Sequence, residues 1–260
     1  MTKLSEEANA LDFRLTDVSL RYATGTYALA PIDMTVARGE FVSLLGPSGC
    51  GKSTLLRVMA GLLEPSMGTV ETFRDAQKAF VFQDATLLPW RSAVRNAQLL
   101  LELEKVPRTQ WSSRVRDALE LVGLTGFERA HPSALSGGMR MRLSLARALA
   151  LDPEIFFMDE PFGALDEITR ESLQEQFLDI WQAKRLTSIF VTHSPTEAIF
   201  MSTKIAVMTR RPGRIHEVFD VPFDYPRSPE LRMTAEFAEF GAIISQSLRR
   251  AMLADMSGKA

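Results

Sequence analysis

The stretch FVSLLGPSGCGKST, residues 41–54, decides the fold. It opens with an apolar run over 41–45, continues with a glycine-rich loop, and leads into an amphipathic segment from Lys52. The pattern predicts a buried strand, a tight loop and a helix in that order. Residues 46–54 also fit G-x-x-x-x-G-K-[ST], in which backbone N–H groups and a helix N-terminus surround phosphate oxygens. The alternative is a structural glycine turn, which the flanking strand and helix disfavour.

This loop predicts a bound nucleotide and Mg²⁺. Lys52 can reach the β- and γ-phosphates, and the Ser53 hydroxyl can ligate the metal ion. Cys50 belongs to the loop, which acts through its backbone, so alkylation of Cys50 should hinder binding only sterically. The candidate nucleotide-binding residues of this segment are Gly46, Pro47, Ser48, Gly49, Cys50, Gly51, Lys52, Ser53 and Thr54.

Strand and helix patterns alternate on both sides of the loop, which indicates a largely parallel α/β sheet. Strands are predicted at 13–22, 32–36, 41–45, 69–72, 79–82, 154–158, 187–191 and 204–208. Helices are predicted after Lys52, within 91–150, and at 168–184, 195–202 and 229–253. Pro107 suits a helix start, and Gly123 suits a helix end.

A second chemical signal is EIFFMDE at residues 154–160. An apolar strand that ends in two acids places carboxylates at the edge of the sheet where ligands of open α/β folds bind. Asp159 would hold Mg²⁺, and Glu160 would act as general base on the attacking water. The alternative, two solvated acids at a strand end, becomes improbable beside the phosphate loop.

Composition narrows the class of protein. The chain has 260 residues with 30 Lys+Arg, 32 Asp+Glu and one Cys, so the net charge is −2 and no internal disulfide forms. Near-neutral charge argues against a protein built to hold nucleic acid. No apolar run approaches the roughly 18–20 residues that span a bilayer, and the N-terminus lacks a signal-peptide pattern. We therefore expect an intracellular protein that reaches a membrane only through a partner.

A family resemblance rests on LSGG at 135–138 before MRMRLSLARALA at 139–150, which resembles the signature sequence of ABC-type ATPases. The other motifs of that family follow in order: Tyr22 before the phosphate loop, Gln83 in VFQD, FGALD at 162–166 and His193 in FVTHS. The resemblance covers nearly all of 12–215. It implies an α/β P-loop NTPase core with an antiparallel β subdomain and an inserted α-helical subdomain.

The resemblance also implies a domain plan. We expect a flexible tail at 1–11, an ABC ATPase domain at 12–215 and a C-terminal extension at 216–260. The domain divides into a core at 12–83 and 146–215 and a helical subdomain at about 84–145. The extension carries a helix whose apolar face packs on its own domain or, alternatively, serves a regulatory or dimer contact; that face comprises Phe237, Phe240, Ile244 and Leu248.

For the signature, the resemblance implies a site shared between two chains. Ser136, Gly137 and Gly138 would form a second anion cradle that closes over the γ-phosphate held by the opposite subunit. The protein would therefore act as a head-to-tail homodimer that assembles on ATP. Asp166 would link the two ATP sites.

Three further residues take roles from the family. Gln83 would contact Mg²⁺ and the attacking water, and His193 would hold the γ-phosphate and align Glu160. A histidine at a strand end often has only a structural role, but the motifs around His193 favour a functional one. Tyr22 would stack on adenine, with Tyr27 as the alternative.

The sequence departs from the family pattern at several positions. Met139 and Met141 stand where many relatives carry Gln, and Ser194 stands where many carry Asp. A thioether accepts hydrogen bonds poorly, so we expect contacts to the nucleotide across the dimer either to be weaker or to rest on the backbone and Arg140. Ser194, Pro195 and Glu197 still form a good helix start. The segment between Gly68 and Gln83 is short, so we expect a reduced antiparallel hairpin there.

Three segments resemble ATPase subunits of bacterial importers for nitrate, taurine and aliphatic sulfonates: VFQDATLLPW (81–90), MDEPFGALDEITRESLQEQFLDIW (158–181) and MTRRPGRI (208–215). This implies a peripheral protein on the cytoplasmic face of the inner membrane, bound to permease subunits and served indirectly by an extracytoplasmic solute-binding protein. Leu87, Leu88, Pro89 and Trp90 would meet the permease or, alternatively, pack within the helical subdomain. The rival functions are a lipid or other exporter, an ABC ATPase of DNA or ribosomes, and a nucleotide-binding regulator without turnover.

Overall fold

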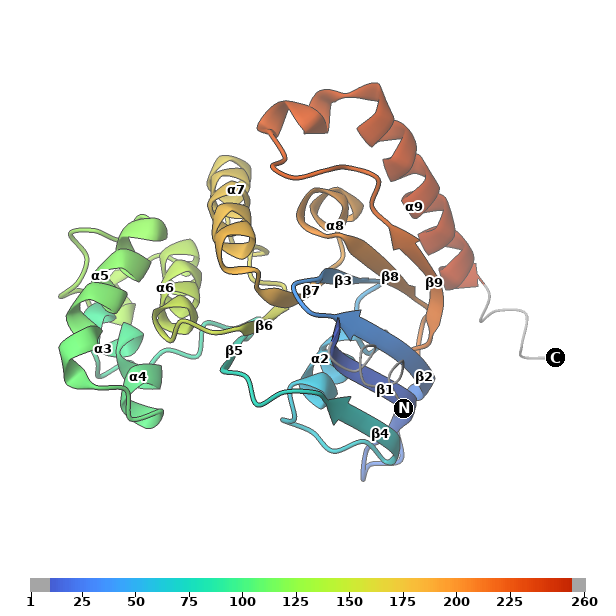
Figure 1. Cartoon of the computed structure of the whole chain (residues 1–260), viewed down its shortest axis with the longest axis horizontal. Coiled ribbons are helices and arrows are strands. Elements are labelled where there is room, and N and C mark those ends of the chain that lie inside the picture. Colours follow the sequence, from blue (N-terminus) through green and yellow to red (C-terminus); the bar gives the residue numbers. More distant parts are fainter. Residues whose placement is uncertain (1–9, 254–260) are drawn as a thin grey trace. The chain divides into compact units, whose positions relative to one another are not determined.

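The computed structural model describes residues 10–253, which form two compact units (Figure 1). The first unit combines Met1–Asp75 with Leu178–Ala260, and the second is Ala76–Phe177. Residues 1–9 of the predicted tail lie outside the described part of the chain. Leu11, the last residue of that predicted tail, is already the first residue of strand β1.

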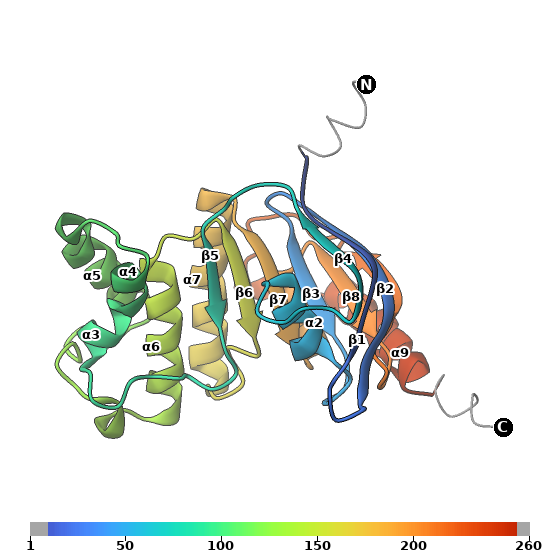
Figure 2. The same cartoon turned by 90° about the horizontal axis from the view of Figure 1, so that it is seen from below.

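An antiparallel sheet in the first unit has the order β2-β1-β4 and confirms the predicted antiparallel subdomain. Its strands are β1 (Leu11–Arg21), β2 (Tyr27–Ala37) and β4 (Met67–Thr72), and β1 and β2 run side by side in Figure 2. The Asp12 carboxylate of β1 is fully buried. It accepts hydrogen bonds from Arg74 Nε at 2.5 Å and from the Thr187 hydroxyl, which anchors β1.

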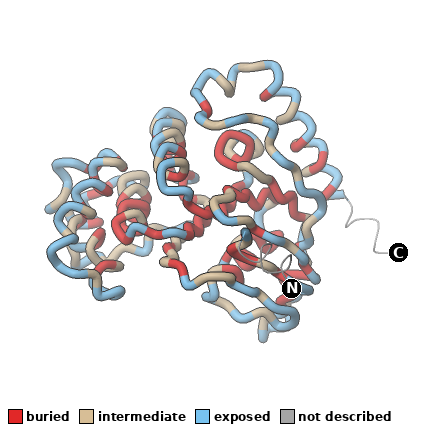
Figure 3. The backbone as a smooth tube through the Cα atoms, viewed as in Figure 1, coloured by how far each residue is buried: buried red, intermediate tan, exposed pale blue. Residues whose placement is uncertain are grey.

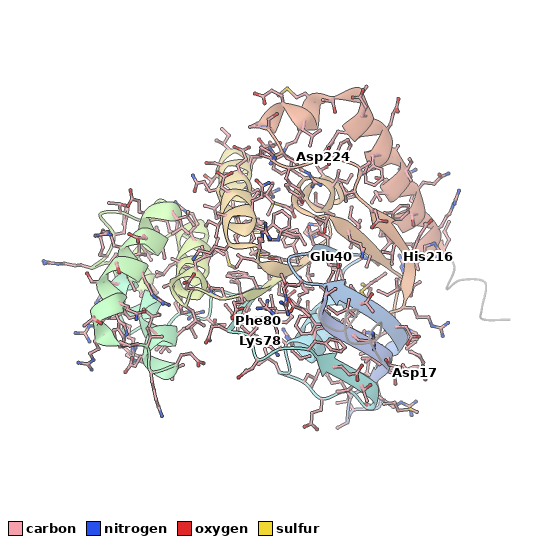
Figure 4. All side chains as sticks on the ribbon, in the orientation of Figure 1. Asp17, Glu40, Lys78, Phe80, His216 and Asp224 are labelled. Atoms are coloured by element: carbon pink, nitrogen blue, oxygen red, sulfur yellow. The ribbon has the colours of Figure 1, made fainter. Side chains whose placement is uncertain are left out.

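The predicted strand before the phosphate loop is β3 (Phe41–Leu45). It lies between β7 (Thr187–Thr192) and β8 (Lys204–Met208) and is parallel to both. Every residue of β3 and β7 is buried (Figure 3), as expected for parallel strands covered on both faces. Glu40, labelled in Figure 4, directly precedes β3, and its carboxylate pairs with Lys204 Nζ at 2.5 Å.

The sheet of the first unit continues past residue 215, where the sequence predicts the end of the ATPase domain. Strand β9 (Ile215–Asp220) pairs antiparallel with β8. Helix α9 (Ala235–Leu253) starts later than the predicted 229, because Pro229–Met233 form a 3₁₀ turn and the Thr234 hydroxyl accepts from Phe237 N at the helix start. Phe240 of α9 packs on Phe219 of β9, so the apolar face of this helix covers its own unit.

A buried arginine closes the C-terminal end of helix α8 (Pro195–Met201). Arg227 donates to the carbonyls of Ile199, Phe200 and Ser202 at 2.7–2.9 Å. Its guanidinium lies 3.9 Å from the centre of the Tyr225 ring. The last carbonyls of α8, which lack partners within the helix, are therefore satisfied by a residue beyond position 215.

The second unit joins two parallel strands to a group of helices, coloured green in Figure 1. Strand β5 (Lys78–Val81) pairs with β6 (Ile155–Asp159). The helices are α3 (Ala93–Ala97), α4 (Leu99–Leu103), α5 (Trp111–Leu121) and α6 (Gly137–Ala150), with 3₁₀ turns at Arg108–Gln110 and Pro132–Ala134. Helix α7 (Glu167–Lys184) begins in this unit and ends in the first.

Two helix boundaries in the second unit lie where the sequence predicts them, at Pro107 and at Gly123. Pro107 directly precedes the 3₁₀ turn that leads into α5. Gly123, two residues after α5 ends, has a φ of 63°, the left-handed conformation that glycine adopts readily at helix ends. Within residues 10–253, no helix combines the length and the apolar character needed to cross a membrane.

The hairpin expected between Gly68 and Gln83 does not form. Strand β4 pairs with β1, whereas β5 pairs with β6. Two contacts of the connecting residues explain the difference. Arg74 binds the buried Asp12, and the Gln77 carbonyl accepts from Glu154 N at 2.9 Å. The start of the connection is therefore held beside β1, and its end is held beside β6.

Candidate functional site

In the first unit, the phosphate loop and His193 begin at one edge of the sheet. Leu45 and Thr192 are the last paired residues of the parallel strands β3 and β7. Gly46 and His193 each follow immediately after these positions. The carboxyl edge of a parallel sheet is where ligands of open α/β folds bind, so two of the predicted elements share this edge.

The phosphate loop depends on glycine for its shape. Gly51 has a φ of 110°, and a Cβ there would lie 2.8 Å from the Leu29 side chain. Gly49 also has a positive φ, and a Cβ there would meet nothing within 4 Å. Lys52 is 4% exposed, and its ammonium donates to the carbonyls of Gly46 at 2.8 Å and Pro47 at 3.0 Å. The loop therefore curls around its own lysine.

A second loop supports the phosphate loop through Gly213. Gly213 N donates to the Ala28 carbonyl at 2.9 Å, and its carbonyl accepts from Ala30 N at 3.0 Å. A Cβ on Gly213 would lie only 2.3 Å from the Cys50 carbonyl oxygen. Burial raises the pKa of the Cys50 thiol, against an opposing effect of Lys52. Cys50 is thus a buried, protonated thiol, and the role of its backbone in nucleotide binding stays a prediction.

The structure distinguishes the two candidate tyrosines. The Tyr22 hydroxyl lies 3.0 Å from Thr54 Oγ1, on the helix that follows the phosphate loop. The Tyr27 ring instead faces the Arg21 guanidinium at 6.0 Å. Tyr22 is therefore joined to the phosphate-binding segment, and its contact with adenine stays a prediction.

The backbone around His193 is fixed by its neighbours. Thr192 Oγ1 donates to Glu197 Oε2 at 2.5 Å and accepts from Ser194 N at 3.0 Å. The Ser194 hydroxyl accepts from Glu197 N at 3.3 Å, with Pro195 as the first helical residue. The predicted start of α8 is confirmed, and these bonds hold the exposed His193 from both sides.

The second unit brings three predicted residues to the edge of its own strand pair. Val81 and Met158 are the last paired residues of β5 and β6. Asp159 follows Met158 and is fully buried, while Gln83 lies two residues beyond Val81 and is exposed. Glu160 has a φ of 47°, a left-handed conformation that is uncommon outside glycine and that concentrates at functional sites.

The signature opens helix α6. Ser136 is the N-cap, and its hydroxyl accepts from Met139 N at 3.2 Å. Ser136 and Gly137 are exposed, Met139 N is already bonded to Ser136, and the binding of an anion at this helix start stays a prediction. A Cβ on Gly138 would approach the Leu165 side chain to 3.2 Å, which requires a glycine or a small shift.

Asp166 caps the next helix, α7. Its carboxylate accepts from Thr169 N at 3.0 Å, and this hydrogen bond holds the pKa of the carboxyl below its usual value. Asp166 is therefore an exposed carboxylate that is ionised and held in place near Leu165 of the same motif.

The predicted metal ligands have suitable chemistry. The Ser53 hydroxyl, the Gln83 amide and the Asp159 carboxylate all offer oxygen, which Mg²⁺ prefers. Across residues 10–253, no group of three or more His, Cys, Asp or Glu side chains could hold a metal ion by itself. This set therefore fits an ion shared with phosphate oxygens rather than a closed protein cage.

Two adjoining cavities lie among the helices of the second unit. One of about 880 Å³ and one of about 490 Å³ share Arg95, Gln98, Arg108 and Trp111 as walls. Trp90, on the rim of the smaller cavity, is 72% exposed. Of the predicted apolar cluster Leu87–Trp90, Leu88 is instead fixed through its backbone by Asn96.

Sequence reasoning missed three residues that shape the site: Gly213, Asn96 and Arg147. Gly213 belongs to the segment MTRRPGRI, which supports the family resemblance but gives no sign of a structural role for the glycine. Arg147 is a lone charge inside the apolar run LSLARALA, and that contrast was the available signal. Asn96 carried no signal, because its role depends on tertiary contacts.

Comparison with known proteins gives a consistent result. A family model described as ABC transporter matches residues 29–163. An uncharacterised ABC transporter ATP-binding protein of Methanocaldococcus jannaschii is 44% identical over 232 residues, 87% of this chain and 86% of that protein. An aliphatic sulfonates import ATP-binding protein of Bacillus subtilis is 42% identical over 215 residues, 80% and 82% of the two chains.

Solved structures agree with the sequence comparison. The dimeric structure of a bacterial ABC transporter cassette matches with a TM-score of 0.74 and 29% identity. It covers 82% of this chain and all of that chain. The same score and identity hold for a dimeric cassette in a post-hydrolysis state bound to ADP and Pi.

Proposed function

Because this chain belongs to the ABC transporter family of ATP-binding proteins, we propose that it energises import of an aliphatic sulfonate or a related small anion such as taurine or nitrate. The protein binds and hydrolyses ATP. The import assignment rests chiefly on its 42% identity, over 80% of the chain, to an aliphatic sulfonates import ATP-binding protein.

In the first unit, the residues of 46–54 bind the triphosphate. Backbone amides of the loop and the N-terminus of α2 (Lys52–Met59) donate to the phosphate oxygens, and the Lys52 ammonium moves from the loop carbonyls to the β- and γ-phosphates. Tyr22 stacks on adenine. His193 contacts the γ-phosphate from the neighbouring strand end.

In the second unit, carboxylates prepare the attacking water. Glu160 accepts a proton from the water as it attacks the γ-phosphorus. Asp159 and Gln83 of this unit, and the Ser53 hydroxyl of the first unit, would each offer an oxygen ligand to Mg²⁺, which would neutralise charge on the phosphate oxygens. Glu160 directly follows β6 and has a left-handed backbone with a φ of 47°.

Two copies complete each site. Ser136, Gly137 and Gly138 at the start of α6 bind the γ-phosphate held by the partner chain, so the dimer is head-to-tail and forms on ATP. Asp166, held beside Leu165, joins the two sites. Dimeric cassettes among the structural matches support this arrangement.

The helices of the second unit receive the permease. We assign its cytoplasmic segment to the adjoining cavities, where Trp90 and Trp111 offer apolar surface and the walls carry both basic and acidic side chains, Arg95 and Arg108 beside Glu102, Glu120 and Glu128. These walls suit a short helix with apolar and charged side chains. The protein then acts at the cytoplasmic face of the membrane, and an extracytoplasmic binding protein selects the solute.

The test is purification of the tagged chain from its native membranes in mild detergent, followed by identification of bound proteins. Recovery of a membrane-spanning permease is expected. Its binding protein is then titrated with alkanesulfonates, taurine and nitrate, and ATP turnover of the reconstituted complex should rise with one of them. Recovery with ribosomes or DNA would retain the ATPase and overturn the transport role.

A further inference from the structure

The loop after Gln83 contains a strained residue. Thr86 has a φ of 44°, in the left-handed region that a β-branched residue adopts rarely. Such a conformation persists only when surrounding contacts enforce it, and it concentrates at functional sites. Thr86 lies three residues after Gln83, so the contacts that enforce its backbone also set the path of the predicted glutamine loop.

Arg147 of helix α6 provides those contacts. Its guanidinium donates to the Thr86 carbonyl at 2.9 Å, to Thr86 Oγ1 at 3.0 Å and to the Ala85 carbonyl at 3.0 Å. A fourth bond, to Ser144 Oγ at 3.2 Å, fixes the guanidinium on its own helix. Thr86 is thus held at both its backbone and its side chain.

The position of Arg147 is costly for a structural residue. The side chain is 6% exposed, and burial lowers the pKa of its guanidinium. Among the side chains of residues 10–253, no carboxylate forms an ion pair with it, so neutral oxygens of the loop carry its charge. An apolar residue would fill this core position at a smaller free-energy cost. We therefore attribute the presence of an arginine here to its hydrogen bonds with the loop.

A second side chain holds the far end of the same loop. Asn96 of α3 is fully buried. Its amide accepts from Leu88 N at 2.8 Å and donates to the carbonyls of Leu88 at 3.1 Å and Arg91 at 2.9 Å. The loop is therefore fastened at Thr86 by α6 and at Leu88–Arg91 by α3.

Helix α6 links this grip to the signature. Its N-cap is Ser136, and Arg147 lies eleven residues later on the same helix, about 16 Å along the axis at 1.5 Å per residue. We propose that Arg147 is a positioning residue that holds the Gln83 loop to the signature helix, so that the two γ-phosphate-sensing elements of the second unit move as one piece. This inference rests on the proposed role of Gln83 in hydrolysis.

The first test replaces Arg147 with lysine, alone and together with Gln83→Ala. A single ammonium cannot reach three oxygens in the fork geometry of a guanidinium. In the native background, Arg147→Lys should lower kcat about tenfold while the Kd for ATP stays within about twofold. In the Gln83→Ala background, the same change should alter kcat less than about twofold, because its target is gone.

The matched control is Arg142→Lys. Arg142 lies on the same helix and also donates to loop carbonyls, those of Val122 at 2.8 Å and Gly123 at 3.2 Å, far along the chain from Gln83. It should leave kcat unchanged in both backgrounds. Circular dichroism and thermal unfolding check that each variant folds.

Thr86→Ala is the second variant, for use if Arg147→Lys does not fold. It removes one hydrogen bond to Arg147 and keeps the arginine, so a smaller fall in kcat is expected, again only when Gln83 is present. An equal fall with and without Gln83, or full activity in folded variants, would overturn the role of Arg147. No ATP turnover by the native protein would instead overturn the proposed function.

Discussion

The phosphate loop of the first unit is held by close main-chain contacts and by a lysine of its own, whereas the loop after Gln83 in the second unit is held by buried side chains of neighbouring helices. Gly51 and Gly213 allow close approach of main-chain atoms, and Lys52 binds carbonyls of its own loop. Arg147 and Asn96 reach the other loop from neighbouring helices. The phosphate loop therefore takes its shape from contacts close to it in the first unit, while the loop after Gln83 takes its position from helices, one of which also bears the signature.

The substitution of Glu160 should have the greatest effect on activity, and it separates the hydrolysis step from the binding of ATP. Glu160→Gln should lower kcat by about 10²–10⁴-fold, because an amide cannot accept the proton of the attacking water. The Kd for ATP, set in the first unit, should stay within about threefold, and the dimer should accumulate in gel filtration with ATP.

Glu154→Gln is the control for that experiment, since Glu154 adjoins the opposite end of β6 and is exposed. Phosphate release at native rates by Glu160→Gln would remove Glu160 as the base and would require another acceptor in the second unit.

Lys52→Ala tests the role of the phosphate loop in the first unit. Loss of a buried ammonium that binds phosphate should raise the Kd for ATP about 100-fold, about 3 kcal/mol. Fluorescent nucleotide titration measures it, with Lys184→Ala at the exposed end of α7 as control. Unchanged affinity would mean that the loop does not hold the triphosphate.

Gly213→Ala asks whether the phosphate loop depends on its supporting loop. The added methyl group cannot coexist with the Cys50 carbonyl at 2.3 Å, so the loop must shift. We expect about a tenfold higher Kd for ATP and a loss of about 1–3 kcal/mol in the free energy of unfolding. Gly241→Ala, whose added Cβ lies 3.8 Å from Ile199, should leave both quantities nearly unchanged or improve stability.

The effect of pH on stability depends on the buried charges of the two units, and it should leave ATP turnover less changed than the substitutions above. Burial by itself would raise the pKa of Asp12, but hydrogen bonds from Arg74 and Thr187 outweigh it and leave the pKa lowered. A lowered native pKa means that Asp12 stabilises the fold above about pH 4 and loses this contribution as pH falls through the native value. Arg147 stays charged throughout, so of these two buried charges acid should weaken only the Asp12 anchor.

Thermal unfolding from pH 7 to pH 3 tests this sign. Asp12→Asn should cost about 1–3 kcal/mol at pH 7 and should flatten the fall in Tm below about pH 4. Asp117→Asn, which removes an exposed pair with Arg116, should change stability by less than about 0.5 kcal/mol. Parallel pH curves for native protein and Asp12→Asn would contradict the assignment.

The sequence predicted the parts of the fold that depend on local chemistry. Strand β3, the phosphate loop and α2 follow from one uninterrupted stretch, and the start of α8 follows from Ser194, Pro195 and Glu197. These features need only neighbouring residues to specify them, so a pattern suffices.

The rest depends on contacts between distant residues. The absent hairpin is explained by Arg74 with Asp12, and the extension of the sheet past 215 by the pairing of β9 with β8. The grip of Arg147 on Thr86 joins residues 61 positions apart. No local pattern encodes such pairs, which is why a single arginine within the apolar run LSLARALA was the only visible trace.

The Arg227 contact has a consequence for the order in which this chain can mature. The carbonyls of Ile199, Phe200 and Ser202 emerge from the ribosome well before the arginine that satisfies them. Until residue 227 is available, the end of α8 has buried acceptors without a donor, and β8 has an open edge where β9 will pair. A chain that ended at the predicted boundary near 215 would therefore lack both the donor for these carbonyls and the strand that pairs with β8, and we expect it to fold less stably than the longer chain.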